Sequence, residues 1–159
     1  MRPFHTTSGT AGGGPRTVPP GRPAPVPLAT ATTTGGSYGL LRVRLLPADE
    51  APYLIHHGED RSFVVLDGRM RVEAASRHFT AVTGDLVFVP RGRPHRCLAL
   101  DGPADVLMLF TPGGAEGLYL ALWPPGHDAD LIVPLSAEYN VDVLALPAQA
   151  PDEPHHHDG

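Results

Sequence analysis

Apolar and polar residues alternate along the middle of this chain, with the period of two that marks a β-strand with one buried face. In the segment 41–45, Leu41, Val43 and Leu45 alternate with two arginines. Short runs rich in β-branched and aromatic residues then follow at close intervals. We therefore predict seven further strands: Tyr53–His56, Ser62–Leu66, Arg69–Ala74, His78–Ala81, Leu86–Val89, Arg96–Leu100 and Val106–Phe110.

Turn-forming residues separate these runs. Asp67-Gly68 between two of them is the strongest hairpin signal in the chain. Eight short strands with regular turns predict an all-β domain, an antiparallel sandwich or barrel. After residue 114 the period becomes helical, and Leu118, Tyr119 and Leu122 share one face of a predicted short C-terminal helix that ends before residue 124. Residues 140–146 fit a late strand or a helix equally well.

The N-terminal part of the chain lacks this patterning. Residues 1–27 hold 12 glycines or prolines and bury too little apolar surface to offset their ordering entropy. We predict a disordered Gly/Pro-rich arm over residues 1–34, one folded domain over 35–147, and a flexible tail over 148–159. A polyproline docking motif within residues 19–27 is the functional alternative for the arm.

Composition and charge narrow the function classes. The chain has 159 residues and no lysine, which excludes a lysine Schiff base and the lysine-bearing phosphate loop. Its single cysteine, Cys97, excludes an internal disulfide. Residues 45–159 carry seven arginines against seventeen acids, a net charge of −10, so we expect no nucleic-acid partner. No membrane span or secretory signal is present, and we expect a cytoplasmic protein without a membrane partner.

One segment carries a motif with fixed spacing. From Gly84 to His95 the sequence reads G, five residues, P-x-G, two residues, H. This resembles the second motif of the cupin superfamily, except that Ala99 stands where the family usually has asparagine. Glycine permits the tight turns of this motif, and the spacing turns His95 toward the barrel interior.

The segment 52–68 resembles the first cupin motif, H-x-H-x4-E-x6-G. Counting back from Gly68, the glutamate position falls on Arg61, the second histidine on His56 and the first on Leu54. The resemblance is to small single-domain cupins near the quercetin-dioxygenase-like group, and it runs from about residue 35 to residue 114. It implies a double-stranded β-helix, or jelly roll. It also implies a homodimer, which would cover an exposed edge strand.

Family members that bind a metal hold it with three histidines and one glutamate. Here Leu54 cannot donate to a metal, and the permanently charged Arg61 repels one. We therefore predict no cofactor. The alternative is a divalent transition metal held weakly by His56 and His95, with Glu59 or Asp60 bending inward. His57 follows His56 directly and faces outward.

Strand parity places His56, Arg61, Phe63, Val65, His95 and Cys97 on the inward faces. This predicts an apolar cavity in which Leu54, Phe63, Val65 and Cys97 contact a small-molecule substrate. An unpaired buried Arg61 would cost several kcal/mol, so an anion should meet it. That anion is a substrate group, with His56 and His95 as general acid and base, or an acid such as Glu59 or Asp60 that plugs a lost metal site.

Three functions remain open at this point. We favour a metal-independent enzyme, a cyclase, isomerase or dehydratase acting on an anionic aromatic or polyketide-like substrate through His56, His95 and Arg61. The alternatives are a metal-dependent dioxygenase or isomerase with altered ligands, and a non-catalytic small-molecule binder. For residues outside this set we expect structural roles: His78 lies on the surface, Cys97 is an inert core thiol rather than a nucleophile, and Tyr119 and Trp123 pack a helix rather than form a lid.

Overall fold

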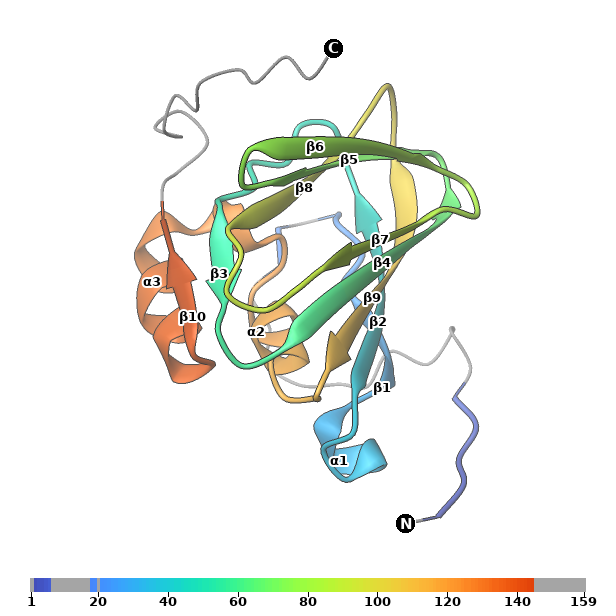
Figure 1. Cartoon of the computed structure of the whole chain (residues 1–159), viewed down its shortest axis with the longest axis vertical. Helices are drawn as coiled ribbons and strands as arrows, with labels where there is room; N and C mark the ends of the chain where they lie inside the picture. Colours follow the sequence, from blue (N-terminus) through green and yellow to red (C-terminus); the bar gives the residue numbers. More distant parts are fainter. Residues whose placement is uncertain (1, 7–17, 20, 145–159) are drawn as a thin grey trace.

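The computed structural model describes residues 2–6, 18–19 and 21–144. Two five-stranded antiparallel sheets face each other in this part of the chain (Figure 1). The first sheet has the order β1 (Val26–Ala29), β2 (Gly39–Leu45), β9 (Ala104–Thr111), β4 (Asp60–Asp67) and β7 (Leu86–Val89). The second has the order β10 (Val141–Val143), β3 (Leu54–His56), β8 (His95–Ala99), β5 (Arg69–Ala74) and β6 (Arg77–Val82). The all-β prediction is confirmed, and each of the eight predicted strands is present.

Alternating side chains explain the sheets. Along β2 and β9 every second residue is buried, and the two strands pair in full register from Gly39 opposite Phe110 to Leu45 opposite Ala104. The buried residues of both sheets form one continuous core. Arg61 on β4 lies in this register opposite Phe110 on one side and Val89 on the other. Arg61 therefore lies in an interior strand of the sheet, and pairing with a strand on each side fixes its position.

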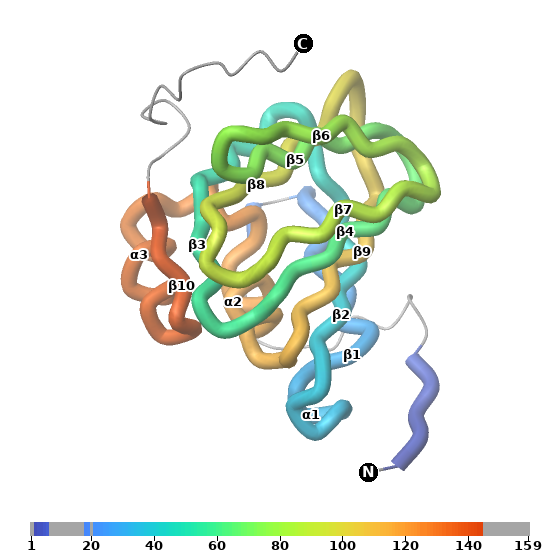
Figure 2. Tube along the Cα trace, in the orientation of Figure 1, coloured from blue at the N-terminus to red at the C-terminus, as the bar shows by residue number. Residues whose placement is uncertain are grey.

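Three helical segments follow β9. The predicted short helix is α2 (Glu116–Ala121), and a 3-10 turn, η1 (Pro125–His127), comes after it. The sequence patterns missed α3 (Ala129–Glu138), which contains Pro134. Its N-terminus is capped by Asp128, which accepts hydrogen bonds from the backbone N–H groups of Asp130 and Leu131. In the tube view α3 and β10 lie side by side next to β3 (Figure 2).

The predicted disordered arm is wrong for its last nine residues. Residues 26–29 form β1, which pairs with β2, and α1 (Ala31–Thr34) follows it. The buried carboxylate of Glu116 accepts hydrogen bonds from the backbone N–H groups of Ala31 and Gly114, both at 2.6 Å. Strand pairing with β2 and hydrogen bonds to the Glu116 carboxylate therefore hold residues 26–34 against the domain, although their composition predicted disorder. The predicted tail, residues 148–159, lies outside the described residues.

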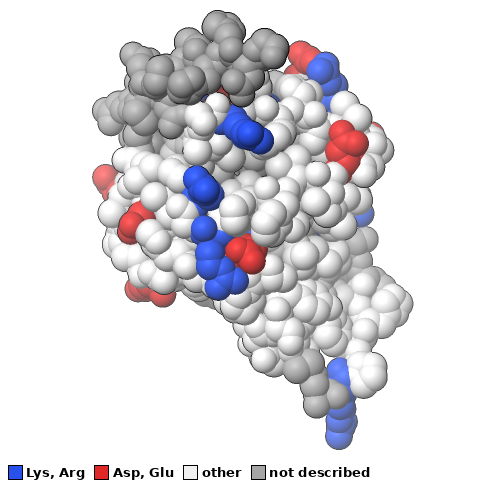
Figure 3. Space-filling view, viewed as in Figure 1, with Lys and Arg blue, Asp and Glu red and all other residues white. Residues whose placement is uncertain are grey.

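Parts of the outer surface are largely uncharged, and some of them expose apolar side chains. On the face shown in Figure 3, arginine and acidic side chains are scattered over a largely uncharged surface. Two of the four edge strands, β6 and β7, expose Phe79, Val82, Leu86 and Phe88. In the described part of the chain, every helix is too short or too polar to cross a lipid bilayer.

Candidate functional site

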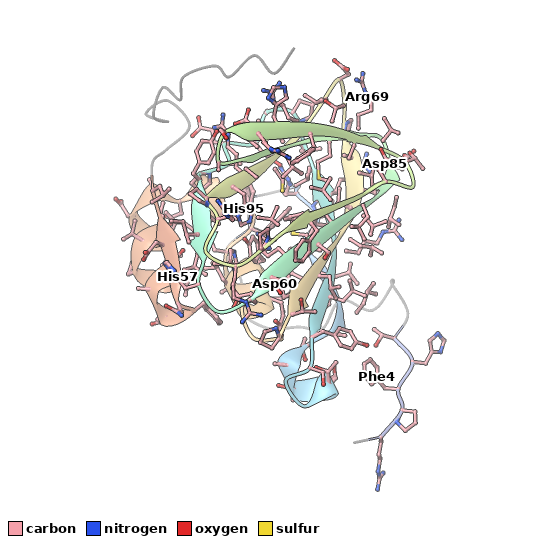
Figure 4. The ribbon with its side chains drawn as sticks, viewed as in Figure 1. Phe4, His57, Asp60, Arg69, Asp85 and His95 are labelled. Atoms are coloured by element: carbon pink, nitrogen blue, oxygen red, sulfur yellow. The ribbon has the colours of Figure 1, made fainter. Side chains whose placement is uncertain are left out.

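The site lies between the sheets, where β3, β4 and β8 bring three predicted residues together. His56 ends β3, Arg61 is the second residue of β4, and His95 begins β8. All three side chains are at most 3% exposed. Figure 4 shows His95 inside the barrel and His57 on the side of α3. As predicted, His57 faces outward, where it contacts Asp142 at 2.8 Å.

The guanidinium of Arg61 occupies the centre of this cluster. Its Nη1 donates to the hydroxyl of Tyr119 at 2.7 Å and to Nε2 of His95 at 3.0 Å, and lies 3.4 Å from Nε2 of His56. The rings of Phe63, Phe110 and Tyr119 surround its carbon Cζ at 4.7–4.8 Å from their centroids. These aromatic faces stabilise the buried cation without neutralising it.

Arg61 has no acid partner among the described residues. Glu59 instead contacts Nδ1 of His56, and Asp60 pairs with Arg91 at 3.2 Å. The alternative in which Glu59 or Asp60 pairs directly with Arg61 is therefore wrong. One edge of the guanidinium is left over, because Nε has no partner and Nη2 meets only the thioether sulfur of Met108, at 3.4 Å. An arginine in this state is a buried donor group that still lacks acceptors.

His95 has a defined protonation pattern. Its Nδ1 lies 3.0 Å from the backbone carbonyl oxygen of Arg93, so Nδ1 carries the proton and Nε2 presents a lone pair to Arg61. Burial and, second, the charge of Arg61 lower the pKa of His95 to about 3. The imidazole is therefore neutral at physiological pH.

His56 connects Tyr119 to Glu59. The hydroxyl of Tyr119 accepts from Arg61 and donates to Nε2 of His56 at 2.9 Å, which leaves Nδ1 of His56 facing the Glu59 carboxyl group. Burial and the neighbouring Arg61 lower the pKa of His56, whereas burial raises the pKa of Glu59 to about 7. The result is a continuous hydrogen-bonded chain from Glu59 through His56 and Tyr119 to Arg61.

Tyr119 is the member of the site that sequence reasoning placed elsewhere. It comes from α2, where helical spacing predicted only helix packing, and burial raises the pKa of its phenol to about 12. Its ring stacks on His56 with an interplanar angle of 7°. The sequence held one indication of this role. Tyr119 lies on the predicted buried face of a helix, and a buried tyrosine hydroxyl needs a hydrogen-bond partner.

A small cavity adjoins this cluster and offers about 40 Å³ to the centres of water-sized molecules. Of the predicted substrate contacts, Leu54 and Cys97 line it, whereas Phe63 and Val65 do not. His56 is also outside the lining, and reaches the cavity only through Tyr119 and Arg61. The rest of the lining around the cluster consists of Leu45, Arg61, His95, Arg96, Met108 and Tyr119. We call the remaining lining residues, 49–52 and 123–125, the mouth, because Glu50 is exposed and Asp49, Ala51 and Pro125 are half-buried.

The residues at the family's metal position do not fit a metal. The two imidazole Nε2 atoms that would donate to it both face Nη1 of Arg61, and Leu54 takes the place of a third donor. A cation already stands between the two remaining ligands, and it cannot lose its proton. Among the described residues no three His, Cys, Asp or Glu side chains gather as a metal cluster.

The other candidates have structural surroundings. His78 is exposed on β6, as expected. Burial raises the pKa of the Cys97 thiol to about 12, which disfavours the thiolate that a nucleophile requires. Trp123 is 1% exposed and stands at the cavity mouth, where the guanidinium of Arg22 lies 5.9 Å from the centroid of its ring.

Comparison with known proteins agrees with this fold. Residues 41–112 match the cupin domain family. The protein TT1209 from Thermus thermophilus superposes with a TM-score of 0.51 at 23% identity, over 59% of this chain and 87% of that chain. A conserved protein with a double-stranded β-helix domain from Klebsiella pneumoniae superposes with a TM-score of 0.51 at 15% identity, over 63% and 85% of the two chains. No curated protein matches the sequence.

At these identities the structural likeness shows the fold alone. The family match covers both motif segments, including Arg61 and His95. The match, the two antiparallel sheets and the neighbouring structures agree on the fold: the chain is an all-β double-stranded β-helix of the cupin type, and its residues 41–112 match the cupin domain family.

Proposed function

We propose that this cupin is a metal-independent enzyme that moves protons on a small anionic substrate, as an isomerase, dehydratase or cyclase does. The observation that carries the proposal is the buried Arg61, which has an unpartnered Nε and no acid partner among the described residues, beside a neutral imidazole and a phenol. Arg61 would hold the anionic group and stabilise the negative charge that develops in the transition state.

His95 and Tyr119 are the proposed proton carriers, because both line the cavity. Nε2 of His95 would give up its hydrogen bond from Nη1 of Arg61 and take a proton from a carbon next to the anionic group, and the electron pair would delocalise onto the oxygens held by Arg61. In isomerisation the proton then returns to another carbon, and in dehydration it leaves with the departing hydroxide as water. In cyclisation the carbanion attacks a carbonyl carbon of the same substrate, the C=O π electrons move onto that oxygen, and the oxygen takes the proton back from His95. Tyr119 would turn its O–H, which donates to Nε2 of His56 in this structure, toward a substrate oxygen.

The electrostatics support a base that is active only with substrate bound. The charge of Arg61 is the second cause, after burial, of the low pKa of His95. An anion on Arg61 compensates this charge and raises the basicity of His95. The histidine is therefore kept neutral without substrate and gains proton affinity when the anion arrives.

His56 has a different proposed role from the one its motif position suggests. It contacts Tyr119 and Glu59 but does not line the cavity. We assign it as a positioning residue. Its Nδ1 faces Glu59, so its Nε2 accepts the hydrogen bond from Tyr119 and thereby orients the phenol. The likeness to the quercetin-dioxygenase-like group stays a prediction, and a metal-dependent dioxygenase is disfavoured by the donor set.

Proton exchange in D2O tests this proposal. The protein is incubated with 2-oxo and 3-oxo carboxylates, and proton NMR follows the loss of each C–H signal and any new product. We expect exchange that resists a chelator, is lost in His95→Gln and Arg61→Met, and persists in Arg69→Met, which removes a surface arginine paired with Asp101. Ligand binding without exchange or product would instead establish the non-catalytic binder.

A further inference from the structure

The guanidinium edge of Arg61 formed by Nε and Nη2 is complementary to one particular ligand group. Nε and Nη2 lie on the same side of a guanidinium, and their N–H bonds are parallel. Within the described part of the chain, Nη1 is occupied by Tyr119 and His95, whereas Nε has no partner and Nη2 has only the weak acceptor Sδ of Met108. Two parallel donors about as far apart as the oxygens of a carboxylate form its bidentate complement.

Size and polarity further restrict the ligand. The cavity that Arg61 lines offers about 40 Å³, enough for a few water-sized groups, and Met108, the neighbour of Nη2, lines it as well. The wall next to the cluster is apolar, formed by Leu45, Leu54, Cys97 and Met108. Arg96 also lines the cavity, but its Nε is paired with Glu73. A tetrahedral dianion would leave oxygens against this apolar wall, and burying them without partners is costly. A planar monoanion with a short apolar body satisfies both the edge and the wall.

We infer that Arg61 binds the carboxylate of a short-chain monocarboxylic acid through Nε and Nη2, with the alkyl part against Leu54, Cys97 and Met108. This inference rests on the proposed function only for the identity of the anion-binding residue. It revises the expectation of an aromatic substrate, because in the described conformation an aromatic ring is too large for the cavity. It also explains why the guanidinium keeps one edge free while its other nitrogen is held by two side chains.

The test follows the Nε–H resonance of Arg61 in nitrogen-resolved NMR spectra, assigned by its loss in Arg61→Met. The probes are acetate, propionate and butyrate, with acetamide as the neutral isostere and inorganic phosphate as the tetrahedral anion. We expect the carboxylates to shift this resonance saturably and acetamide to leave it unchanged. Fluorescence of Trp123, the only tryptophan of the chain, gives an independent binding curve at the cavity mouth.

Two variants and one control complete the test. Arg61→Lys keeps the charge but has no fork of donors, so we expect acetate affinity to fall by about tenfold, and by about a hundredfold in Arg61→Met. Arg69→Met should bind acetate as the unmodified protein does. Where Arg61→Met does not fold, Arg61→Lys, which also lacks Nε–H, gives the assignment, and the Trp123 fluorescence titration of the unmodified protein still decides between the probes.

Three results would overturn the inference: no response to any carboxylate, an equal response to acetamide, or tighter binding of phosphate than of acetate. These outcomes are separable from failure of the proposed function. Saturable acetate binding without proton exchange supports the ligand class and rejects the enzyme. Exchange on a non-carboxylate anion without acetate binding does the reverse.

Discussion

Tyr119 and Arg61 are 58 positions apart in the chain, and their side chains meet at 2.7 Å between the phenol oxygen and Nη1. The contact joins α2 to the middle of the first sheet, and it places the only hydroxyl of the described cluster between a cation and an imidazole. Every experiment on Arg61 is therefore also an experiment on Tyr119 and His56.

Tyr119→Phe removes this hydroxyl and leaves Nη1 of Arg61 and Nε2 of His56 each with one partner fewer. We expect the free energy of unfolding to fall by about 1–3 kcal/mol, because buried polar groups lose a partner and gain no water. Denaturant unfolding measures the change. Tyr38→Phe is the matched control for the loss of a phenol oxygen away from the site, and an equal effect in both variants would contradict the prediction.

Stability should depend on pH through His95. Its pKa is lowered to about 3 in the native protein, whereas the unfolded value is near 6.5. Between these two pH values His95 binds a proton in the unfolded chain but not in the native protein, so the free energy of unfolding falls as pH is lowered from 6.5 toward 3. Each such proton contributes about 1.4 kcal/mol per pH unit. Unfolding titrations should show a shallower decline in His95→Gln than in the unmodified protein, and an unchanged slope would be evidence against a buried neutral His95.

Glu59 acts in the opposite direction. Its pKa is raised to about 7, so the native protein keeps a proton that the unfolded carboxyl releases near 4.5. Its contribution to stability is present below pH 4.5 and is lost as pH rises through about 7. Glu59→Gln removes this compensation, and we expect the decline in stability between pH 6.5 and 4.5 to become steeper. The comparison with His95→Gln separates the two groups, since their effects on the slope have opposite signs.

Metal analysis tests the interpretation of the donor set. After dialysis against a chelator we expect less than one equivalent of any transition metal per chain, because Arg61 stands between the imidazoles of His56 and His95. The histidine run at residues 155–157 can bind metal on its own account, so a chain ending at residue 147 is the control. One retained ion in that shortened chain would disprove the prediction.

The N-terminal segment contacts two residues of the cavity mouth, Asp49 and Trp123, and we expect this closure to restrict access to the cavity. Arg22 pairs with Asp49, donates to the backbone carbonyl oxygen of Arg44 at 2.8 Å, and lies over Trp123. Arg22→Gln should loosen this closure and increase quenching of Trp123 fluorescence by acrylamide. Arg69→Gln removes a pair at the surface instead and should leave the quenching unchanged. Equal quenching in all three proteins would show that Arg22 does not close the mouth.

The predicted homodimer has a definite surface to be tested. Edge strands β6 and β7 leave backbone groups unpaired within the described chain and expose four large apolar side chains, those of Phe79, Val82, Leu86 and Phe88. We expect light scattering to give the mass of two chains, and Phe88→Glu to shift it to that of one. A single-chain mass for the unmodified protein would refute the homodimer.

The strands were predictable because their alternation directly encodes which side chains face the core. The fixed spacing of the two motifs was equally informative, since their resemblance to the cupin motifs implies that Arg61 and His95 share one site. β1 and α3 were missed for physical reasons. Composition favoured disorder where pairing with β2 and the Glu116 carboxylate impose order, and Pro134 argued against a helix that its neighbours nevertheless form.

The candidate site was predictable only in part. Parity places a side chain inside or outside, but it does not say how deep the side chain lies. His56 and Val65 are inside and yet do not reach the cavity, because Tyr119 and the core stand between. Tyr119 itself depends on how α2 docks against β3 and β4, a long-range relationship that carries no local signal.

The unpartnered edge of Arg61 also bears on how long the protein survives in the cell. A buried cation without a carboxylate of its own weakens the folded state, and a bound anion that removes this weakness stabilises that state in proportion to its concentration. The folded fraction then follows the supply of ligand. If the inferred acid binds at Arg61, chains made when it is scarce would unfold more often and be degraded sooner, and the abundance of the protein would follow its substrate without a dedicated regulator.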